Sequence, residues 1–303
     1  MANTRALKAR IRSAENILQI TKSMKMVSAS KLRRTQTAMG RLAPMADGSR
    51  RLLQELLSVS GEQEYPLLEK RPEPRRVCYV LFVGNRGLCG VYNTALEKFF
   101  RERAARDGRD CFAVVCGKWG QDVIEASGIA VRRRFAELSD VPKPEDADLL
   151  AGYLKELYLA GEADEIVLVY QRYDSFLRQT PYMRPLLPVP LDEEKSTGGF
   201  RDYIFEPDKE TLIQTLTDLY ISSSVLDVLL EARTGEHAAR MASMTSAADN
   251  TDQLISSLTL SLNHARQAAI TTEISEIAGG AEALNNVKKQ PITGGDGNEK
   301  GNS

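Results

Sequence analysis

The chain has 303 residues, 42% of them hydrophobic, and a formal net charge of −1, so it can bury a core in one large domain or in two of ordinary size. No stretch approaches the 18 or more apolar residues of a membrane span, and the basic start lacks the apolar centre of a secretory signal. The four cysteines lack paired spacing, which argues against a disulfide framework, and we expect them to be reduced thiols in the core. Two histidines are too few to favour a histidine-based metal or catalytic site, and we expect both His237 and His264 on helix surfaces.

Residues 1–60 are predicted to form one long coiled-coil helix that ends at Gly61. Small or apolar side chains recur at alternating steps of three and four, the pattern of a coiled-coil seam: Leu7, Ile11, Ala14, Leu18 and Thr21. A second row implies another neighbour: Ile17, Ile20, Met24 and Val27. Gly40 and Pro44 are expected to bend or weaken this helix.

The same segment is strongly basic. Residues 1–51 contain twelve lysines and arginines against Glu15 and Asp47, so the helix is expected to bind an acidic partner. A basic, amphipathic start is also typical of an organelle-targeting presequence, but the helical pattern continues past any cleavage point. Aromatic residues for stacking bases and bulky anchors for lipid are missing, which favours an acidic protein surface over nucleic acid or an anionic membrane.

Residues 61–207 are predicted to form a Rossmann-like α/β domain. Apolar, β-rich runs at 77–83, 111–116, 131–135 and 166–170 alternate with helical patterns at 91–106, 119–127 and 145–159. Strands that alternate with helices indicate a parallel sheet. Residues 180–207 contain five prolines and are expected to be loop or irregular β structure.

A glycine-rich turn, GNRGLCG at residues 84–90, follows the first predicted strand and precedes a helix. This is where a phosphate-binding loop would lie in a dinucleotide-binding fold, but the spacing is GxxGxxG instead of GxGxxG, and the chain has no GxxxxGK[ST]. We therefore expect a tight turn that packs or docks.

Residues 208–284 are predicted to form a second coiled-coil helix. Its seam runs through Met241, Met244, Ala248, Thr251, Ile255, Leu258, Leu262, Ala265, Ala269 and Thr272. At 1.5 Å per residue the helix would be roughly 110 Å long, whereas a compact domain of this chain length has a radius of gyration of about 19 Å. The helix is therefore expected to protrude and to contact a partner. Residues 285–303, rich in Gly, Asn and Lys, are expected to be disordered.

The sequence shows no catalytic motif. Serines and threonines are plentiful, but no base is placed by motif to activate one, and the acidic run Asp192, Glu193 and Glu194 lies in a polar loop. We expect no enzyme active site, metal or cofactor in this chain.

Five stretches resemble a known family: ITKSMKMVSASK (20–31), GNRGLCG (84–90), FEPD (205–208), EHAARMASMTSAADN (236–250) and LNHARQAAITTEISEIAGGAEAL (262–284). They are similar to the gamma-subunit family of bacterial F-type ATP synthases. The resemblance implies an antiparallel coiled coil of the two terminal helices with a central Rossmann-like domain. It also implies a non-catalytic rotor, the central stalk of a rotary motor for ATP synthesis driven by ion transport. Asn85 departs from the family pattern, since many relatives have Asp there.

The same resemblance implies partners and contact residues. The coiled coil would enter a hexamer of alpha and beta subunits, and the foot would sit with the epsilon subunit on the membrane c-ring, peripheral to the cytoplasmic face of a bacterial membrane. Six residues would lie at the catch with the beta subunits: Met24, Lys25, Arg240, Arg266, Gln267 and Thr271. Tyr203 and Glu206 would approach the membrane ring.

Two alternatives remain at this point. One is a nucleotide-binding enzyme with a coiled-coil arm, which would use the turn at Gly84 as its phosphate site. The other is a generic coiled-coil scaffold that associates with itself through the seam. From the pattern alone, Arg240, Arg266 and Gln267 are equally consistent with ordinary solvated positions beside a coiled-coil seam.

Overall fold

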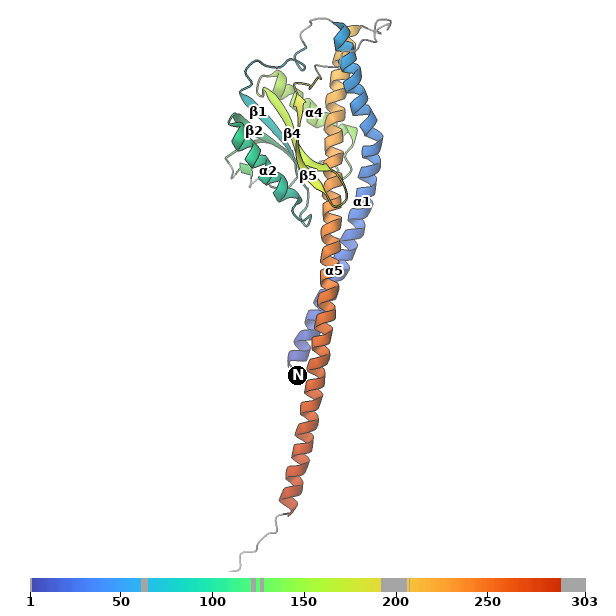
Figure 1. Cartoon of the computed structure of the whole chain (residues 1–303), viewed down its shortest axis with the longest axis vertical. Helices are drawn as coiled ribbons and strands as arrows, with labels where there is room; N and C mark the ends of the chain where they lie inside the picture. Colours follow the sequence, from blue (N-terminus) through green and yellow to red (C-terminus); the bar gives the residue numbers. More distant parts are fainter. Residues whose placement is uncertain are drawn as a thin grey trace, which may run out of the picture. The chain divides into compact units, whose positions relative to one another are not determined.

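The computed structural model describes residues 2–60, 65–120, 124–125, 128–191, 206 and 208–289, and within these it leaves the side chains of 2–3, 43–44, 46–47, 58–60 and 283–289 undescribed. The elements follow in the order α1 (Ala2–Ser60), β1 (Arg76–Phe82), α2 (Tyr92–Asp107), β2 (Asp110–Cys116), β3 (Ala130–Phe135), α4 (Pro144–Leu159), β4 (Glu165–Tyr173), β5 (Gln179–Leu187) and α5 (Lys209–Lys289) (Figure 1).

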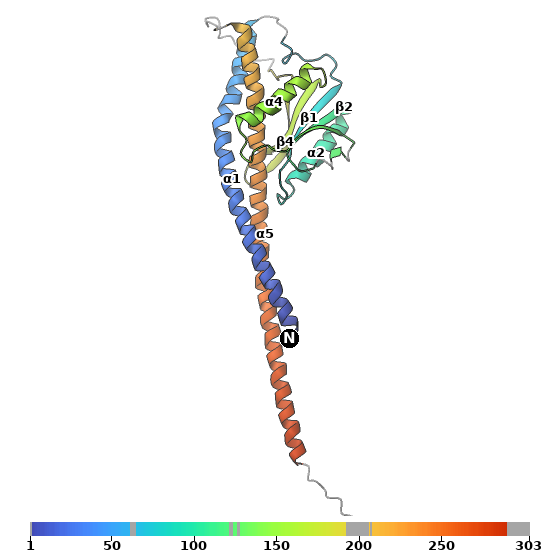
Figure 2. The same cartoon turned by 180° about the vertical axis from the view of Figure 1, so that it is seen from behind.

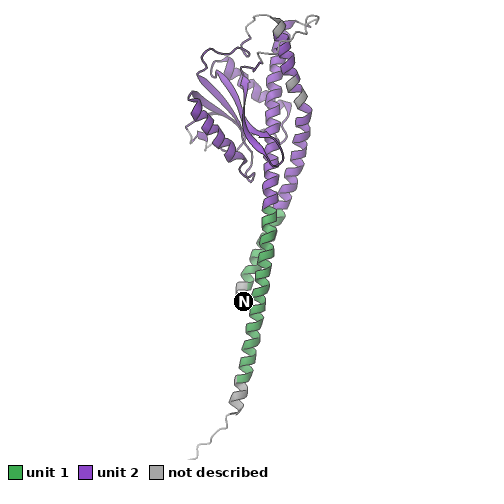
Figure 3. Ribbon diagram, in the orientation of Figure 1, with its two compact units in different colours: residues 1–20, 247–303 green, residues 21–246 purple. Residues whose placement is uncertain are grey.

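The chain divides into two compact units (Figure 3). Unit 1 consists of residues 1–20 and 247–303, and unit 2 consists of residues 21–246. Both long helices contribute to both units. The boundaries of the two units therefore differ from the predicted boundaries between helices and α/β domain, which lie near residues 60, 208 and 284.

In unit 1, residues 2–20 of α1 run antiparallel beside the first part of the α5 segment that starts at residue 247, and α5 then continues past the end of α1 (Figure 3). Ala14 is 4% exposed, and nine further seam positions are buried or half-buried: Leu7, Ile11, Leu18, Ala248, Thr251, Ile255, Leu258, Leu262 and Ala265. The predicted seam is confirmed at these positions. From Arg266 to Glu282 every residue is exposed, so the prediction that the seam continues through Ala269 and Thr272 is wrong.

The core of unit 2 is a five-stranded sheet in the order β3-β2-β1-β4-β5. β1 pairs in parallel with β2 and β4, and β2 pairs in parallel with β3. The seven-residue β1 is buried at every position but the first, as its continuous apolar run predicts for a strand covered on both faces.

Helices cover the two faces of this sheet (Figures 1 and 2). Val77, Tyr79 and Leu81 of β1 face a cluster with Leu96 and Phe100 of α2. The alternate residues of β1 join α4, α5 and the end of α1 on the other face, through Cys78, Val80, Phe82, Leu53, Leu154 and Leu229. Unit 2 is thus a three-layer α/β domain.

Helix ends in unit 2 have local explanations. α4 begins at Pro144, and the Asp146 carboxylate accepts from the Lys143 N–H at 3.0 Å. α5 begins after Asp208, whose carboxylate accepts from the Thr211 N–H at 2.9 Å. α2 ends at Gly108, where φ is +70°.

The structure corrects several expectations. The sheet is mixed, because β5 pairs antiparallel with β4 in a region expected to be loop or irregular β structure. β5 carries Pro181 and Pro185, which an edge strand tolerates because one side forms no ladder. α5 ends at Lys289, five residues later than expected.

Other expectations are confirmed or fall outside the described part. α1 is assigned as one helix through Gly40 and Pro44. All four cysteines are free, with Cys111 half-buried and the others buried. The helix expected at 119–127 is described only at 124–125, which are helical. Residues 285–289, the start of the predicted disordered tail, are helical, and residues 290–303 lie outside the described part of the chain.

Candidate functional site

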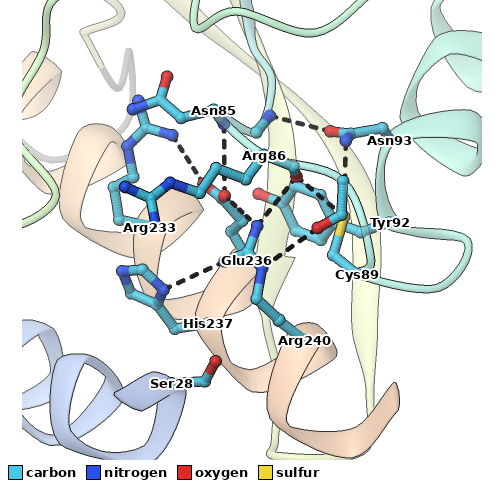
Figure 4. A network of polar contacts seen from close by, with 12 residues as sticks. Ser28, Asn85, Arg86, Cys89, Tyr92, Asn93, Arg233, Glu236, His237 and Arg240 are labelled. Carbon is cyan, nitrogen blue, oxygen red and sulfur yellow. Dashed lines mark hydrogen bonds and ion pairs between the residues drawn. The ribbon is translucent and has the colours of Figure 1, made fainter. Parts of the chain in front are cut away.

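The glycine-rich turn after β1 is held at its backbone by side chains from α2 and α5 (Figure 4). The Asn93 Oδ1 accepts from the Gly84 N–H at 2.9 Å, and the Glu236 Oε1 accepts from the Asn85 N–H at 3.3 Å. A Cβ at Gly84 would lie 3.2 Å from atoms of both Asn93 and Glu236. A larger residue here would push these two side chains away by a few tenths of an ångström, so glycine favours the close approach of the turn.

Glu236 lies between two buried arginines of its own helix. Its Oε2 is 2.7 Å from the Arg233 Nη1 and its Oε1 is 2.5 Å from the Arg240 Nη2. The three side chains are 4 to 7% exposed. Burial raises the pKa of Glu236, but the charges and hydrogen bonds of the two arginines outweigh burial and hold the pKa below its usual range. The carboxylate is thus kept ionised between two cations.

The two arginines also donate to the turn. Arg240 donates from Nη2 to the Arg86 carbonyl at 2.9 Å and from Nε to the Gly87 carbonyl at 3.3 Å. Arg233 donates to the Val83 carbonyl at 3.3 Å. Residues of two motifs that are far apart in the sequence, GNRGLCG and EHAAR, therefore join one network, which we call the α5 lock. It consists of the turn 83–91 with Asn93, Arg233, Glu236 and Arg240.

Close packing accompanies these polar contacts. The Tyr92 hydroxyl donates to the Ala232 carbonyl at 2.7 Å, and the Gln171 amide donates to the Tyr92 carbonyl at 2.9 Å. A Cβ at Gly235 would lie 3.2 Å from the Tyr92 ring. The lack of a side chain at Gly235 therefore lets helix α5 lie close to the Tyr92 ring at the start of α2.

The α5 lock occupies the position where open α/β sheets usually bind ligands. α2 and α4 cover opposite faces, and the strand order changes direction between β1 and β4, which makes their carboxyl ends the topological switch point. Here the Glu236 carboxylate accepts from a turn amide, in the place where a nucleotide phosphate would accept from it. The crevice is thus filled by the chain's own helix.

A cavity of about 230 Å³ lies beside the lock, between α1, α5, the turn and the β3–α4 connection. Its lining includes Met24, Lys31, Arg86, Asp140 and His237. Lys31 forms an ion pair with Asp140, and this hydrogen bond from Lys31 is the main reason that the Asp140 pKa is lowered.

His237 corrects an expectation, because it is 2% exposed and does not lie on a helix surface. Its Nδ1 lies 3.4 Å from the Arg240 Nη1, and its Nε2 lies 3.4 Å from the Asp140 carbonyl oxygen. Arginine can only donate and a carbonyl can only accept, so the neutral ring carries its proton on Nε2. Burial is the main cause that lowers the His237 pKa; Arg240 lowers it further, against Glu236 and Asp140. His264 is exposed, as expected.

The residues predicted to contact partners are divided between the two units. Met24 and Arg240 line the same cavity in unit 2, and Lys25 is half-buried on α1. Arg240 is buried in the α5 lock, whereas Arg266, Gln267 and Thr271 are exposed in unit 1. Glu206 is exposed, and Tyr203 lies outside the described residues.

Sequence reasoning missed Glu236, Arg233 and Asn93. The steps of three and four from Glu236 to the two arginines place all three side chains on one helix face, which was a usable signal for an ion-paired cluster. Nothing in the sequence indicated that the cluster is buried against the turn.

Unit 1 has an apolar groove of its own. It has a volume of about 400 Å³ and is lined by Arg10, Ser13, Ala14, Ile17, Leu254 and Leu258. Ile17 and Leu254 are 50% and 52% exposed. The pair of helices thus leaves apolar surface outside its own seam.

Within the described ranges, no cluster of His, Cys, Asp and Glu has the arrangement to hold a metal ion. No helix in this part of the chain is long and apolar enough to cross a membrane.

Comparisons with known proteins agree with one another. A family model described as ATP synthase matches residues 3–284. The ATP synthase gamma chain of Desulforamulus reducens is 40% identical over 287 residues, covering 94% of this chain and all of the relative. The gamma chain of Moorella thermoacetica is 39% identical over 284 residues, again covering 94% of this chain and all of the relative.

Solved structures share the fold. A chain in the cryo-EM structure of the Euglena gracilis mitochondrial ATP synthase (OSCP/F1/c-ring, rotational state 3) has a TM-score of 0.67 at 21% identity, with coverage of 97% of this chain and 99% of that one. A chain in the rotor of the same enzyme, rotational state 1, has a TM-score of 0.62 at 20% identity, with coverage of 89% and 99%.

Proposed function

The chain belongs to the ATP synthase gamma-chain family and is a non-catalytic, central-stalk subunit of a rotary ATP synthase; from this premise we propose how its parts do that work. The paired helices of unit 1 insert into a hexamer of alternating alpha and beta subunits. Unit 2 is the foot, which binds the epsilon subunit and the membrane c-ring. Ion flow through the ring turns the chain, and the chain changes the catalytic sites in turn.

The observation that carries this proposal is the exposed end of α5. Residues 266–282 are helical and exposed at every position, and Ile270, Ile274 and Ile277 are 46%, 62% and 67% exposed. Most helical stability in proteins comes from packing an apolar face, and the described residues offer this stretch none. An enclosing partner supplies that packing.

A single shaft within a ring of like subunits has a mechanical consequence. One asymmetric chain presents a different surface to each of three catalytic subunits. A ligand or partner shifts a conformational equilibrium only through its different affinities for the two states. A difference of about 5.5 kcal/mol moves a two-state site from 1:99 to 99:1, so rotation carries each site through its states.

The proposed contacts with the beta subunits are Met24, Lys25, Arg266, Gln267 and Thr271. Lys25 and its basic neighbours face an acidic loop of beta, and such exposed ion pairs are worth about 0 to 1 kcal/mol, which suits contacts that break on every turn. Arg240 has a different role in this proposal: since it is buried in the α5 lock, it acts on the partner through the turn that it holds.

At the foot, Tyr203 and Glu206 approach the membrane ring. The chain is then peripheral, at the cytoplasmic face of a bacterial cell membrane.

Two alternatives are less well supported. A nucleotide-binding enzyme needs the crevice at the end of β1, but Arg233 and Glu236 fill it. Isothermal titration of the chain with ATP and NAD is therefore expected to show no tight stoichiometric binding. A generic scaffold would bury the exposed isoleucines of α5 by self-association.

The test is co-expression with the alpha and beta chains, followed by native mass spectrometry and an ATPase assay. We expect a complex that contains one copy of this chain and three copies each of alpha and beta. Recovery of only homo-oligomers would overturn the proposal.

A further inference from the structure

Strand β3, at one edge of the sheet of unit 2, carries three consecutive exposed arginines: Arg132, Arg133 and Arg134. The register between β2 and β3 shifts after Ala113, and Arg132 is the extra residue there. In a regular strand successive side chains point to opposite faces, but a bulge of this kind re-aims the side chains next to it.

Two of these arginines lie on the face of the sheet that α4 covers. The guanidinium carbon of Arg132 is 4.3 Å from the centre of the Phe112 ring. That of Arg133 is 4.8 Å from the centre of the Phe135 ring and 4.5 Å from the centre of the Tyr153 ring of α4. Both phenylalanines belong to the hydrophobic cluster on this face, and Tyr153 packs against it. The bulge therefore brings two guanidinium groups to the same face.

Arg133 differs from its two neighbours because its guanidinium has no acceptor within the described part of the chain. Arg132 forms an ion pair with Glu162, and Arg134 donates from Nε to the Gly117 carbonyl at 3.1 Å. The Arg133 guanidinium lies on its two rings and forms no ion pair or hydrogen bond with the side chains that the structure describes. Charges on an edge strand also prevent unwanted pairing with other chains, but that role needs no fixed orientation of the side chain.

Stacking on two rings prepares the Arg133 guanidinium for a ligand. A long side chain that is already held in one orientation loses less entropy when it binds. Its N–H groups remain available, and their planar arrangement matches a carboxylate with two parallel hydrogen bonds. Burial is the main reason that the Tyr153 pKa is raised; of the charged side chains nearby, Arg133 and Arg132 lower this pKa and Glu162 raises it. Cations therefore outnumber carboxylates around this ring.

The surroundings favour an acidic protein segment over nucleic acid. Bases of single strands stack on open aromatic rings, whereas these rings face the arginines, and Phe135 is 6% exposed. Leu149 of α4, one turn before Tyr153, is 59% exposed and offers an apolar contact. A partner that fits has carboxylates opposite the two arginines and an apolar side chain opposite Leu149.

We propose that this surface, which we call the arginine face (Arg132, Arg133, Leu149 and Tyr153), docks an acidic segment of another protein. Arg133 recognises a carboxylate of that segment, and Arg132 and Leu149 support the contact. The arginine face contains none of the residues proposed above as subunit contacts, so this inference goes beyond the proposed function.

The experiment measures the binding of an acidic peptide to the full chain by fluorescence anisotropy. The probe is a fluorescein-labelled peptide of four glutamates followed by two leucines, and its control has glutamines in place of the glutamates. About 0.15 M salt screens the loose attraction of the basic residues of α1. The variant is Arg133→Ala. The matched control is Arg103→Ala, which removes another exposed arginine whose guanidinium carbon lies 5.4 Å from the centre of the Phe99 ring.

We expect Arg133→Ala to bind the acidic peptide about tenfold more weakly than wild type, because a charge-assisted pair of hydrogen bonds is lost. Arg103→Ala should stay within about twofold of wild type. Arg133→Lys keeps the charge but not the planar group, and it should lose nearly as much affinity as Arg133→Ala. The thermal unfolding midpoints of these variants should lie within about 2 °C of wild type.

Four results would overturn the inference: no binding of the acidic peptide by wild type, equal losses for Arg133→Ala and Arg103→Ala, full affinity in Arg133→Lys, or a clearly lower unfolding midpoint for Arg133→Ala. The third would show that charge alone attracts the peptide, and the last that Arg133 serves the fold. A loss confined to the binding of labelled oligouridylate would also overturn it and would assign the face to nucleic acid. The assay uses the chain without the alpha and beta subunits, so its failure leaves the proposed function as it stands.

Discussion

Two stretches of helix α5 have opposite surroundings. In residues 228–240 every side chain is buried except those of Glu231 and Ala239, which are half-buried, and the stretch includes three charged side chains of the α5 lock. In residues 266–282 every side chain is exposed. The charged and apolar side chains of the first stretch are paired and packed within the chain. The apolar side chains of the second stretch can be packed only by a partner. One helix can thus be both an anchor and a surface for a partner.

The largest effect is expected from a variant that removes the carboxylate between the two buried arginines of residues 228–240. Glu236→Ala leaves two buried guanidinium groups without their carboxylate, and we expect a loss of about 3 to 5 kcal/mol in the free energy of unfolding. Urea unfolding followed by the fluorescence of Trp119, the only tryptophan, reports on unit 2. Glu276→Ala, at an exposed position on the same helix, should change this free energy by less than about 0.5 kcal/mol. Equal losses of unfolding free energy for Glu236→Ala and Glu276→Ala would contradict the difference between the two stretches.

A second pair compares apolar residues. Leu229 is 1% exposed and belongs to the core, so Leu229→Ala should cost about 2 to 5 kcal/mol in urea unfolding of the chain. Ile274 is 62% exposed, so Ile274→Ala should leave the free chain within about 0.5 kcal/mol of wild type. In the assembled complex we expect Ile274→Ala to lower the thermal stability. If it also destabilised the free chain strongly, the exposed end of α5 would have an internal role.

A third pair compares two glycines within α5. Gly235→Ala should cost about 1 to 3 kcal/mol, because the new methyl would meet the buried Tyr92 ring at 3.2 Å. The Tyr92 ring is held by its hydrogen bond to Ala232 and cannot easily move. Gly279 has open space around it, so Gly279→Ala should stabilise its helix by about 0.5 to 1 kcal/mol, as helical circular dichroism during heating would show. Effects of the same sign at both positions would contradict this account.

The smallest expected effect is a pH dependence caused by His237. Its pKa is lowered in the folded chain, mainly by burial, so between the unfolded value near 6.5 and the lower folded value only the unfolded chain binds the proton. The free energy of unfolding should therefore fall as the pH falls below about 6.5. The charged groups around the ring are Lys31, Arg86, Asp140, Glu236 and Arg240.

His237→Gln removes this titration and should flatten the slope of unfolding free energy between about pH 6.5 and 5, measured by urea unfolding at each pH. His264→Gln changes an exposed histidine of the same helix and should leave the slope as in wild type. A slope that persists in His237→Gln would assign it to another group.

Much of the fold could be predicted because its signals are local. The two long helices and the four strands of the parallel part follow from hydrophobic period, and the bounds of α1 and the start of α5 agree with the prediction. β5 was not recognised as a regular strand, because Pro181 and Pro185 suggest a loop, and only the edge position of the strand tolerates them. The end of α5 was set five residues early, since Asn and Lys near Lys289 are weak stop signals.

The site was less predictable because it depends on contacts between distant parts of the sequence. Arg240 could be singled out by resemblance, but its partners Arg86 and Gly87 lie about 150 residues earlier, at separations of 154 and 153. The burial of His237 and the role of Glu236 follow from the way α5 fills the crevice at the end of β1. The periodicity of hydrophobic residues along the chain carries no information on contacts between residues so far apart in the sequence.

The most direct test of the rotor function is single-molecule rotation of the assembled complex. Glu102→Cys, at an exposed position on α2, offers a site for a bead, since three of the native thiols are buried and Cys111 can be replaced by serine. With the alpha and beta subunits fixed to a surface, ATP is expected to turn the bead in one direction through three equal steps. Active ATP hydrolysis with a bead that never turns would contradict the account.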